Sequence, residues 1–375
     1  MKKTLLAAAL LAGFAGAASA QSSVTLYGVV DLGYSYQTIK SPIQKRSQFA
    51  MASGQQSSSR WGLKGVEDLG NGLKANFVYE SGITANTGSS TDFTRQSTLG
   101  LTSTSWGSID LGRRSSPGTW AFSGIDPFSA SFGSSALDAS MGAQFIRLSN
   151  MVMYTTPNMS GFGAAVGYSN DTGLTSRGNS ASTAPTFSTS NKMRAVSVGL
   201  RYANGPLLVS GMYDTYMPAS TSARNKVNAV QWNIGATYDL KVVKIAAAYG
   251  QNINGLVEGQ STINNAATSG GDSNTGGGIL FNDGAKTNSW MLGLTAPVGA
   301  AGKVFASIQQ MIPGGNFKVT SGANSSATQT TASIGYTYSM SKRTNLYAFY
   351  SYTNNVLMVE SISANQVGVG VRHLF

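Results

Sequence analysis

The chain has 375 residues, of which 11% are charged and 41% are apolar; 45 are glycine and none is cysteine. Ordinary soluble domains carry about 25% charged residues, and disordered chains combine high charge with few aromatic residues, so this composition favours an all-β protein with many turns. A formal net charge of +11 would suit a nucleic-acid-binding protein, but the basic residues are scattered, and we expect no nucleic-acid partner.

The first twenty residues have the features of a secretory signal peptide. Two lysines precede an apolar run, and Ala18-Ser19-Ala20 provides a small-residue cleavage site. The alternative is an N-terminal anchor helix. We expect residues 1–20 to be removed and residues 21–375 to form the mature protein. Loss of the two lysines of the signal peptide lowers the formal net charge from +11 to +9. The remaining sequence has no run of about 18 apolar residues, so we expect no transmembrane helix.

From Val24 onward, apolar and polar residues alternate. Val24, Leu26 and Val30 fall on one face of an extended segment, and Asp31 falls on the other. Successive side chains of a β-strand point to opposite faces, so the pattern predicts a strand with one apolar and one polar face.

The next segments repeat this pattern. After a polar connection, Arg60 and Lys64 fall on the face opposite Trp61 and Leu63. An Asn-Gly pair at residues 71–72 then predicts a tight hairpin turn. In the strand that we expect after this turn, polar residues share one face and apolar residues the other.

Two-faced segments continue to the end of the chain, and counting them gives sixteen predicted strands. Examples lie at residues 162–168, 196–202, 230–238, 243–249, 290–296 and 332–338. One segment is irregular. Leu99, Leu101 and Arg95 all occupy odd positions (the same parity), so regular alternation would put these apolar and charged side chains on one face of the strand. Either a β-bulge between them or a place for Arg95 on a loop end would reconcile the pattern.

The predicted connections alternate between short and long. Long ones, rich in Ser, Asn, Gly and Thr, lie at residues 170–192, 252–286 and 313–328. Strands of about ten residues, with short turns on one side and long loops on the other, are typical of a transmembrane β-barrel. Such a barrel must close because lipid cannot satisfy a free strand edge, and sixteen strands leave a water-filled channel. A soluble β-sandwich would explain the alternation but not the strand number.

One connection, residues 114–147, fits neither a strand nor a long helix. It lies between two predicted strands and contains Asp126 and Asp138. A compact domain rarely keeps so long a connection unless the connection is functional. We expect this segment to fold inward and narrow the channel.

The chain ends in a predicted strand whose last residue is Phe375, and in a closed barrel this strand pairs with the first one. At this point the sequence resembles the general trimeric porins of Gram-negative outer membranes. The resemblance rests on residues 22–31, 59–80, 94–101, 107–113 and 366–375. It implies a sixteen-stranded antiparallel transmembrane barrel in outer-membrane lipid, with short periplasmic turns, long extracellular loops and an inward-folded third loop. It also implies a homotrimer, and recognition of Phe375 by the barrel-assembly machinery.

The resemblance further implies a basic cluster on the channel wall at the constriction. The matching motifs place this cluster at Arg60, Arg95 and Arg147. The alternation independently puts Arg60 and Arg147 on polar faces, Arg147 with the parity of Ser149 and opposite Leu148. An arginine that faces hydrocarbon costs roughly 2–4 kcal/mol at the midplane, which favours an inward orientation.

Three further basic residues fall on polar faces by the same parity, namely Lys64, Lys74 and Arg114. Rings of basic side chains favour anions. We therefore expect a diffusion pore for ions and small hydrophilic solutes, with a modest anion preference if Asp126 and Asp138 bend away or pair locally. If these acids face the arginines, a transverse field arises and the preference weakens.

Two other functions remain as alternatives. A solute-specific channel or an adhesin-type barrel is one, and Trp120, Phe122 and Phe128 could supply part of an aromatic slide for a sugar. An enzyme is the other, but the only histidine is His373, and the sequence has no G-x-S-x-G, H-E-x-x-H or Walker motif. We expect no catalytic residues, no cofactor and no metal site.

Overall fold

The structure, a computed structural model, describes residues 23–142, 146–176, 192–219, 227–257, 278–315 and 327–375. The expected signal peptide at residues 1–20 and parts of the long connections lie outside the described residues. Among the described residues, no helix has the length and apolar character needed to cross a membrane.

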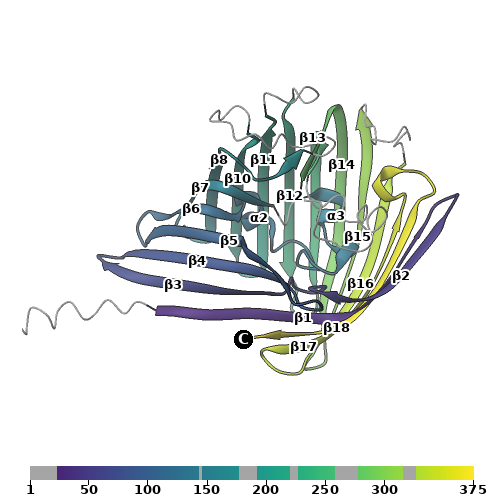
Figure 1. Cartoon of the computed structure of the whole chain (residues 1–375), viewed down its shortest axis with the longest axis horizontal. Coiled ribbons are helices and arrows are strands. Elements are labelled where there is room, and N and C mark those ends of the chain that lie inside the picture. Colours follow the sequence, from purple (N-terminus) through teal and green to yellow (C-terminus); the bar gives the residue numbers. More distant parts are fainter. Residues whose placement is uncertain (1–22, 143–145, 177–191, 220–226, 258–277, 316–326) are drawn as a thin grey trace, which may run out of the picture.

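The described chain forms one antiparallel sheet that closes on itself (Figure 1). The strands are β1 (Ser23–Lys40), β2 (Lys45–Ser53), β3 (Arg60–Gly70), β4 (Leu73–Thr84), β5 (Ser89–Ser103), β6 (Gly107–Ser115), β7 (Arg147–Thr155), β8 (Phe162–Ser169), β9 (Thr175–Ser176), β10 (Arg194–Asn204), β11 (Leu207–Met217), β12 (Ala229–Asp239), β13 (Lys244–Leu256), β14 (Gly278–Val298), β15 (Gly302–Gly315), β16 (Gln329–Ser339), β17 (Thr344–Asn354) and β18 (Ser363–Leu374).

These segments make up the sixteen expected strands, so the predicted fold is confirmed. β2 and β3 form one interrupted strand, because both pair with the same side of β1. β9 is a two-residue parallel pairing with β14 and does not cross the wall.

The first and last strands close the barrel. Residues 29–40 of β1 pair with residues 363–374 of β18. Beyond this ladder, the Gly28 amide donates to the Phe375 carbonyl at 3.0 Å, and the Phe375 amide donates to the Gly28 carbonyl at 3.1 Å. The Phe375 ring lies where a side chain on Gly28 would stand. Closure leaves no free edge, as a wall in lipid requires.

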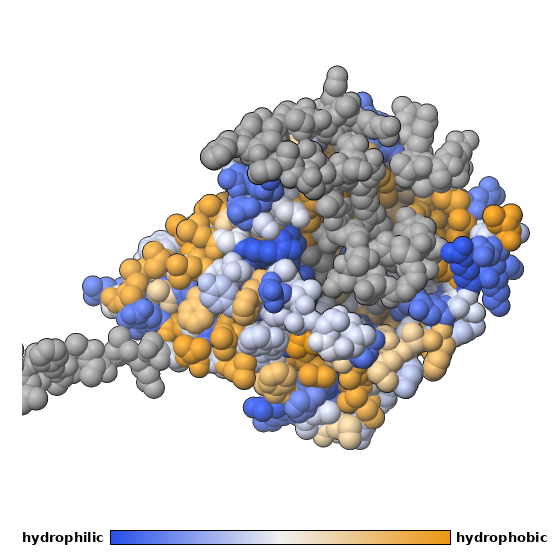
Figure 2. Space-filling view, in the orientation of Figure 1, coloured by the Kyte–Doolittle hydropathy of each residue, from blue (hydrophilic) through white to orange (hydrophobic). Residues whose placement is uncertain are grey.

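The two faces of the wall differ as the alternation predicted. Val24 and Leu26 are exposed outward at 64% and 58%, whereas Asp31 and Ser35 on the opposite face of β1 are buried. Figure 2 shows broad apolar areas on the outer surface of the wall, with hydrophilic residues at strand ends. An apolar outer band with a polar interior is the arrangement of an outer-membrane barrel.

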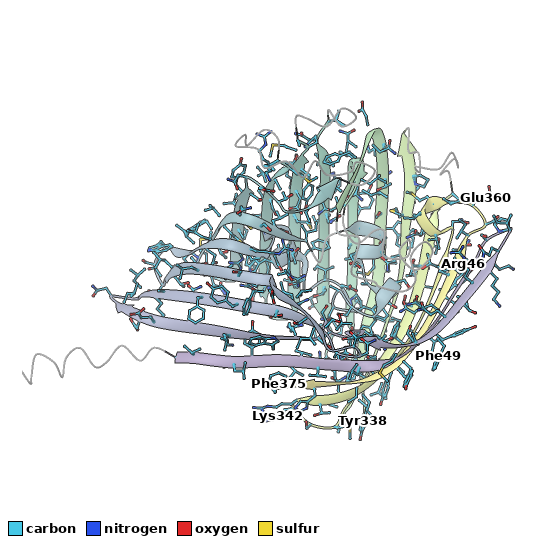
Figure 3. All side chains as sticks on the ribbon, viewed as in Figure 1. Arg46, Phe49, Tyr338, Lys342, Glu360 and Phe375 are labelled. Carbon is cyan, nitrogen blue, oxygen red and sulfur yellow. The ribbon has the colours of Figure 1, made fainter. Side chains whose placement is uncertain are left out.

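The two ends of the barrel carry different connections. Figure 3 places Phe375 close to Lys342, which lies in the short turn between β16 and β17. Arg46, near the β1–β2 hairpin tip, and Glu360, in the β17–β18 connection, lie at the other end. The connections that are longer in sequence, such as those between β6 and β7 and between β13 and β14, join strand ends on this side.

Residues 116–146, between β6 and β7, form the inner loop. Its described part contains α2 (Pro117–Phe122), η2 (Gly133–Ser135) and α3 (Asp138–Met141), and neither a strand nor a long helix. Three residues of the predicted connection 114–147 lie in strands instead, because β6 extends to Ser115 and β7 begins at Arg147. The α2 helix starts where it does because Ser116 Oγ accepts from the Thr119 amide at 3.1 Å and Pro117 occupies the first turn. A second short helix, η4 (Val356–Met358), lies in the β17–β18 connection.

The inner loop packs on the inside of the wall. Its α2 helix contacts β8, β10 and β11, its α3 helix contacts β13 to β15, and η2 contacts β16 and β17. Apolar residues on the loop, including Phe122, Ile125 and Leu137, are fully buried against Met212 and Met291 of the wall. Burial on this scale fixes the loop in one position.

Small wall residues make this close approach possible. A Cβ atom on Gly199 would collide with the Pro117 carbonyl oxygen, and one on Gly293 would collide with the Pro127 ring. The wall is therefore shaped to hold the inner loop at these two points.

Candidate functional site

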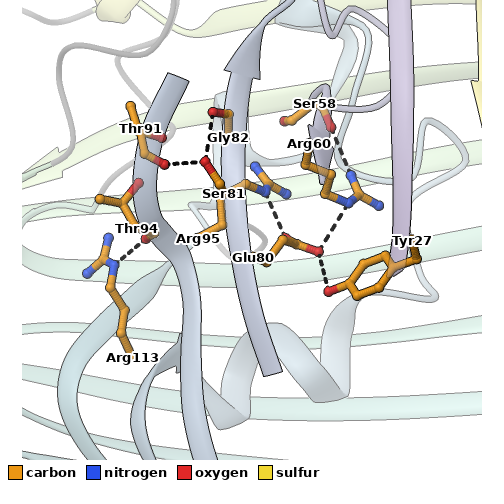
Figure 4. Close-up of polar contacts among 10 residues, drawn as sticks. All are labelled: Tyr27, Ser58, Arg60, Glu80, Ser81, Gly82, Thr91, Thr94, Arg95 and Arg113. Atoms are coloured by element: carbon orange, nitrogen blue, oxygen red, sulfur yellow. Dashed lines mark hydrogen bonds and ion pairs between the residues drawn. The ribbon is translucent and has the colours of Figure 1, made fainter. Parts of the chain in front are cut away.

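Two arginines and one glutamate from adjacent strands meet on the inner wall. Arg60 begins β3, Glu80 lies in β4 and Arg95 lies in β5. Arg60 Nε lies 3.3 Å from Glu80 Oε2, and Arg95 Nε donates to Glu80 Oε1 at 2.8 Å (Figure 4). The structure therefore brings together two of the three arginines that the sequence assigned to the cluster.

A bulge in β5 places Arg95 in this group. Glu80 pairs with Gln96, but two residues further along β4 Gly82 pairs with Thr91, so β5 contains extra residues between these points. Phe93, inside the bulge, adopts a left-handed backbone conformation with φ +35°. The sequence left open a bulge between Arg95 and Leu99 or a loop end at Arg95. The ladder is regular from Gln96 to Ser103, so the irregularity lies at Arg95 itself and not between Arg95 and Leu99.

Tyr27 of β1 supports the glutamate from the other side. Its hydroxyl donates to Glu80 Oε2 at 3.1 Å, and Lys64 Nζ lies 5.4 Å from the centre of its ring, a geometry that permits a cation–π interaction. A Cβ atom on Gly62 would stand 2.8 Å from this ring, so a glycine at this position leaves room for Tyr27. Lys64 thus lies beside the cluster, as its parity predicted.

Glu80 is the functional residue that the sequence reasoning missed. Its parity placed it on the polar face of its strand, but nothing local indicated that it would stand between two arginines of neighbouring strands. The carboxylate offsets one of the two guanidinium charges. Arg60, Arg95 and Glu80 together carry one net positive charge, and the Arg60 side chain remains 27% accessible.

Two other predicted basic residues do not join this group. Arg114 forms an ion pair with Asp110, which also accepts from Asn76 Nδ2 at 3.2 Å, so its charge is neutralised locally. Lys74 is exposed beside the turn between β3 and β4. It is six residues from Glu80, a distance of about 20 Å along a strand.

Arg147 lies at the root of the inner loop. It is the first residue of β7 and pairs with Ser115. The adjacent Leu148 was expected to face lipid, and this was wrong, because Leu148 is 1% exposed within an interior apolar cluster. The β6–β7 register shifts between Gly112 and Arg114, which changes the alternation of β7 at this point. That Arg147 belongs to the basic cluster stays a prediction.

Asp126 pairs within the inner loop. Its carboxylate accepts from the amides of Phe128 at 2.9 Å, Ala130 at 2.9 Å and Leu137 at 3.0 Å. Burial raises the pKa of Asp126, and these three donors act in the opposite direction. Asp138 is the first residue of α3 and is 6% exposed. The expected anion preference required both acids to bend away or pair locally. Asp126 meets this condition, and for Asp138 it stays a prediction.

Two of the three aromatic residues suggested for a sugar slide are not placed for that role, and the third, Trp120, is half-buried beside an apolar cluster. Phe122 and Phe128 are fully buried between the inner loop and the wall, so neither can contact a passing solute. Phe128 packs edge-on against Phe305 of β15, with ring centres 4.9 Å apart. These two phenylalanines hold the loop, and the suggestion that they contact solute was wrong.

Arg113 is a further cation near the cluster, to which the sequence did not assign it. It donates through Nε to the Thr94 carbonyl and through Nη1 to Ser149 Oγ at 2.8 Å. It thus ties the β5 bulge that contains Arg95 to β7, and Figure 4 shows its contact with Thr94. In the described ranges, no group of three or more His, Cys, Asp or Glu side chains is placed to hold a metal ion.

Comparisons with known proteins agree with this architecture. The sequence model of a family described as Gram-negative porin matches residues 7–356. An outer membrane porin protein of Bordetella pertussis is 43% identical over 397 aligned positions, and outer membrane porin protein 32 of Delftia acidovorans is 32% identical over 406. Both alignments cover all of this chain and all of the relative.

A solved structure described as an anion-selective porin from Comamonas acidovorans superposes with a TM-score of 0.71 at 26% identity. The match covers 95% of this chain and all of that one. The family match, the full-length relatives and the closed barrel support one conclusion: this chain belongs to the Gram-negative porin family.

Proposed function

We propose that this porin forms a water-filled channel through the outer membrane that passes ions and small hydrophilic solutes and modestly prefers anions. The observation that carries the proposal is the group formed by Arg60, Arg95 and Glu80, whose net charge is positive. The helices of the inner loop pack on the strands from β8 to β17, whereas this group comes from β3, β4 and β5. The passage would therefore run between the inner loop and the basic wall.

Electrostatics supports the preferred ion. At 4 Å, two unit charges interact with about 1 kcal/mol in bulk water and with several-fold more near a low-dielectric wall. One uncompensated arginine at a narrow point is thus enough for a modest preference. Asp126 opposes it little, because its carboxylate is buried within the inner loop, where it accepts from three of the loop's amides. The similar porin from Comamonas acidovorans is described as anion-selective, which agrees with this direction.

Measurement of reversal potentials in planar bilayers under a KCl gradient tests the proposal. We expect chloride to permeate better than potassium. Arg95→Gln and Arg60→Gln should each reduce the ratio of the two permeabilities, whereas Lys74→Gln, which removes the same charge far from the group, should change it little. Clear cation selectivity of the unchanged protein would contradict the proposal.

Three further expectations accompany this function. We infer that the chain is exported and cleaved after residue 20, and that it assembles as a homotrimer. We also infer that the barrel-assembly machinery recognises Phe375. The exposed position of Phe375 at the end of β18 is compatible with a recognition role before closure. N-terminal sequencing of the mature protein and light scattering of the detergent-solubilised protein test the first two.

A further inference from the structure

The interruption between β2 and β3 projects into the barrel. Residues 54–59, called here the β2–β3 segment, leave the ladder with β1 and pack on the inner wall. Gln55 is buried, and its Nε2 donates to the Tyr347 hydroxyl of β17 at 3.2 Å. The Gln55 carbonyl accepts from the amide of Phe132, in the inner loop, at 2.6 Å. The segment therefore stands between the wall and the inner loop.

Asp31 of β1 holds the segment by its backbone. The fully buried carboxylate accepts from the amides of Gln56 at 2.7 Å and Ser57 at 2.6 Å through Oδ2. Its other oxygen accepts from the Tyr347 hydroxyl at 2.6 Å. Buried charged groups in proteins are normally hydrogen-bonded in this way, and here the donors come from the segment and from the opposite side of the barrel seam.

The wall is shaped to admit the segment. A Cβ atom on Gly33 of β1 would stand 2.7 Å from Gln55 Nε2, and one on Gly368 of β18 would stand 2.5 Å from Gln55 Oε1. A larger residue at either position would crowd Gln55, and it would also meet the Val369 carbonyl oxygen at Gly33 or the Phe349 ring at Gly368. The inward position of the segment thus depends on particular residues of both strands that meet at the seam.

The segment touches two arginines, one on each side. Arg60 Nη1 donates to the Ser58 carbonyl at 2.9 Å, and Arg372 Nη1 donates to Ser57 Oγ at 3.0 Å. Arg372 lies in β18, directly opposite Asp31 in the backbone ladder between β1 and β18. Its Nε donates to Asn345 Oδ1 at 2.9 Å. Arg60 and Arg372 therefore contact neighbouring residues of the same segment.

We propose that the β2–β3 segment is a second constricting element of the channel, that Asp31 positions it, and that Arg372 is a further cation of the constriction. This inference rests on the proposed function, since it concerns the same passage. Ser58 is exposed on the segment, whereas the next residue, Ser59, is buried. The segment therefore presents one side to the channel and the other to the wall.

The absence of cysteine from the chain permits a direct test by thiol labelling. We expect Ser58→Cys to react with water-soluble methanethiosulfonate reagents in open channels, with a stepwise loss of single-channel conductance. A negatively charged adduct should lower the chloride preference, and a positively charged adduct should raise it. A merely structural role of the segment would not make the direction of this shift depend on the charge of the reagent. The matched control, Ser59→Cys, should stay unreactive because this position is buried.

The positioning role of Asp31 is tested in the Ser59→Cys background. Adding Asp31→Asn should release the segment, because the amides of Gln56 and Ser57 lose their charged acceptor. The buried thiol should then become reactive, and the conductance should rise. Heat-modifiable migration in SDS gels shows whether the barrel itself remains folded. A folded double variant whose introduced thiol stays unreactive would overturn the positioning role.

Arg372→Gln tests the further cation, and it should lower the ratio of chloride to potassium permeability. An unchanged ratio would remove Arg372 from the constriction. If the unchanged channel conducts and prefers anions but Ser58→Cys is inert, or reacts without changing the conductance, the second constricting element is refuted while the proposed function stands. If the unchanged channel shows cation preference, the proposed function fails, whereas a conductance block on labelling of Ser58→Cys would still locate the segment in the passage.

Discussion

Arg95 donates through Nε to Glu80 Oε1 over 2.8 Å, although regular alternation along β5 would put Arg95 on the outer face with Leu99. The bulge between the pairs formed by Gln96 and Thr91 reverses its direction. An ion pair thus depends on a backbone irregularity, and Glu80 reduces the net charge of the group from two to one.

Removal of the carboxylate should strengthen the anion preference. In Glu80→Gln, the charges of Arg60 and Arg95 are no longer offset, and at 4 Å one unit charge contributes about 1 kcal/mol even in bulk water. We expect a several-fold rise in the ratio of chloride to potassium permeability, measured from reversal potentials. Glu67→Gln, which removes the same charge at an exposed position near the end of β3, is the control. An unchanged ratio in Glu80→Gln would show that the group lies outside the ion path.

Loss of the Asp126 carboxylate should loosen the inner loop without unfolding the barrel. Asp126→Ala leaves three buried amides without an acceptor, and each unsatisfied buried group costs about 1–3 kcal/mol. We expect noisier single-channel current and faster proteolysis within the loop. Asp92→Ala, at an exposed site in β5, should leave the current as quiet as before. If the current noise of the Asp126→Ala channel equals that of the unchanged channel, apolar packing alone fixes the loop.

A methyl group on the inner wall should displace the loop. Gly199→Ala places a Cβ atom against the Pro117 carbonyl oxygen at the start of α2, and overpacking of this kind costs roughly 1–3 kcal/mol. We expect an altered conductance, since the loop must shift. The control is Gly211→Ala on the neighbouring strand, where the nearest atom, the Asn233 carbonyl oxygen, would be 3.9 Å away. Equal conductance in the two variants would contradict the predicted contact.

A larger residue at the barrel seam should impair closure. Gly28→Val would occupy the space of the Phe375 ring and would also approach the Arg60 carbonyl oxygen, 2.8 Å from a Cβ atom. We expect a smaller fraction of folded, heat-modifiable barrel after refolding into detergent, while Gly211→Val should refold more completely. Similar yields for the two variants would show that the ring can move aside at little cost.

The sequence could predict only part of the candidate site. Parity placed Arg60 and Lys64 on the inner face, and both lie there. Parity failed for Leu148, because the β6–β7 register shift lies between residues that look regular in the sequence. Glu80 was visible as a polar residue, but its position between two arginines depends on the pairing of three strands, which no single segment specifies.

The closed sixteen-stranded wall could be predicted from the sequence alone, since repeated alternation with no long apolar helix leaves an amphipathic barrel as the structure that satisfies every backbone group in lipid. The contents of that wall could not be predicted in this way. The inward fold of residues 54–59, the burial of Phe122 and Phe128, and the local pairing of Asp126 all depend on contacts between residues far apart in the chain. Alternation is a local property with a period of two, whereas lateral contacts depend on register and bulges, which one strand alone does not encode.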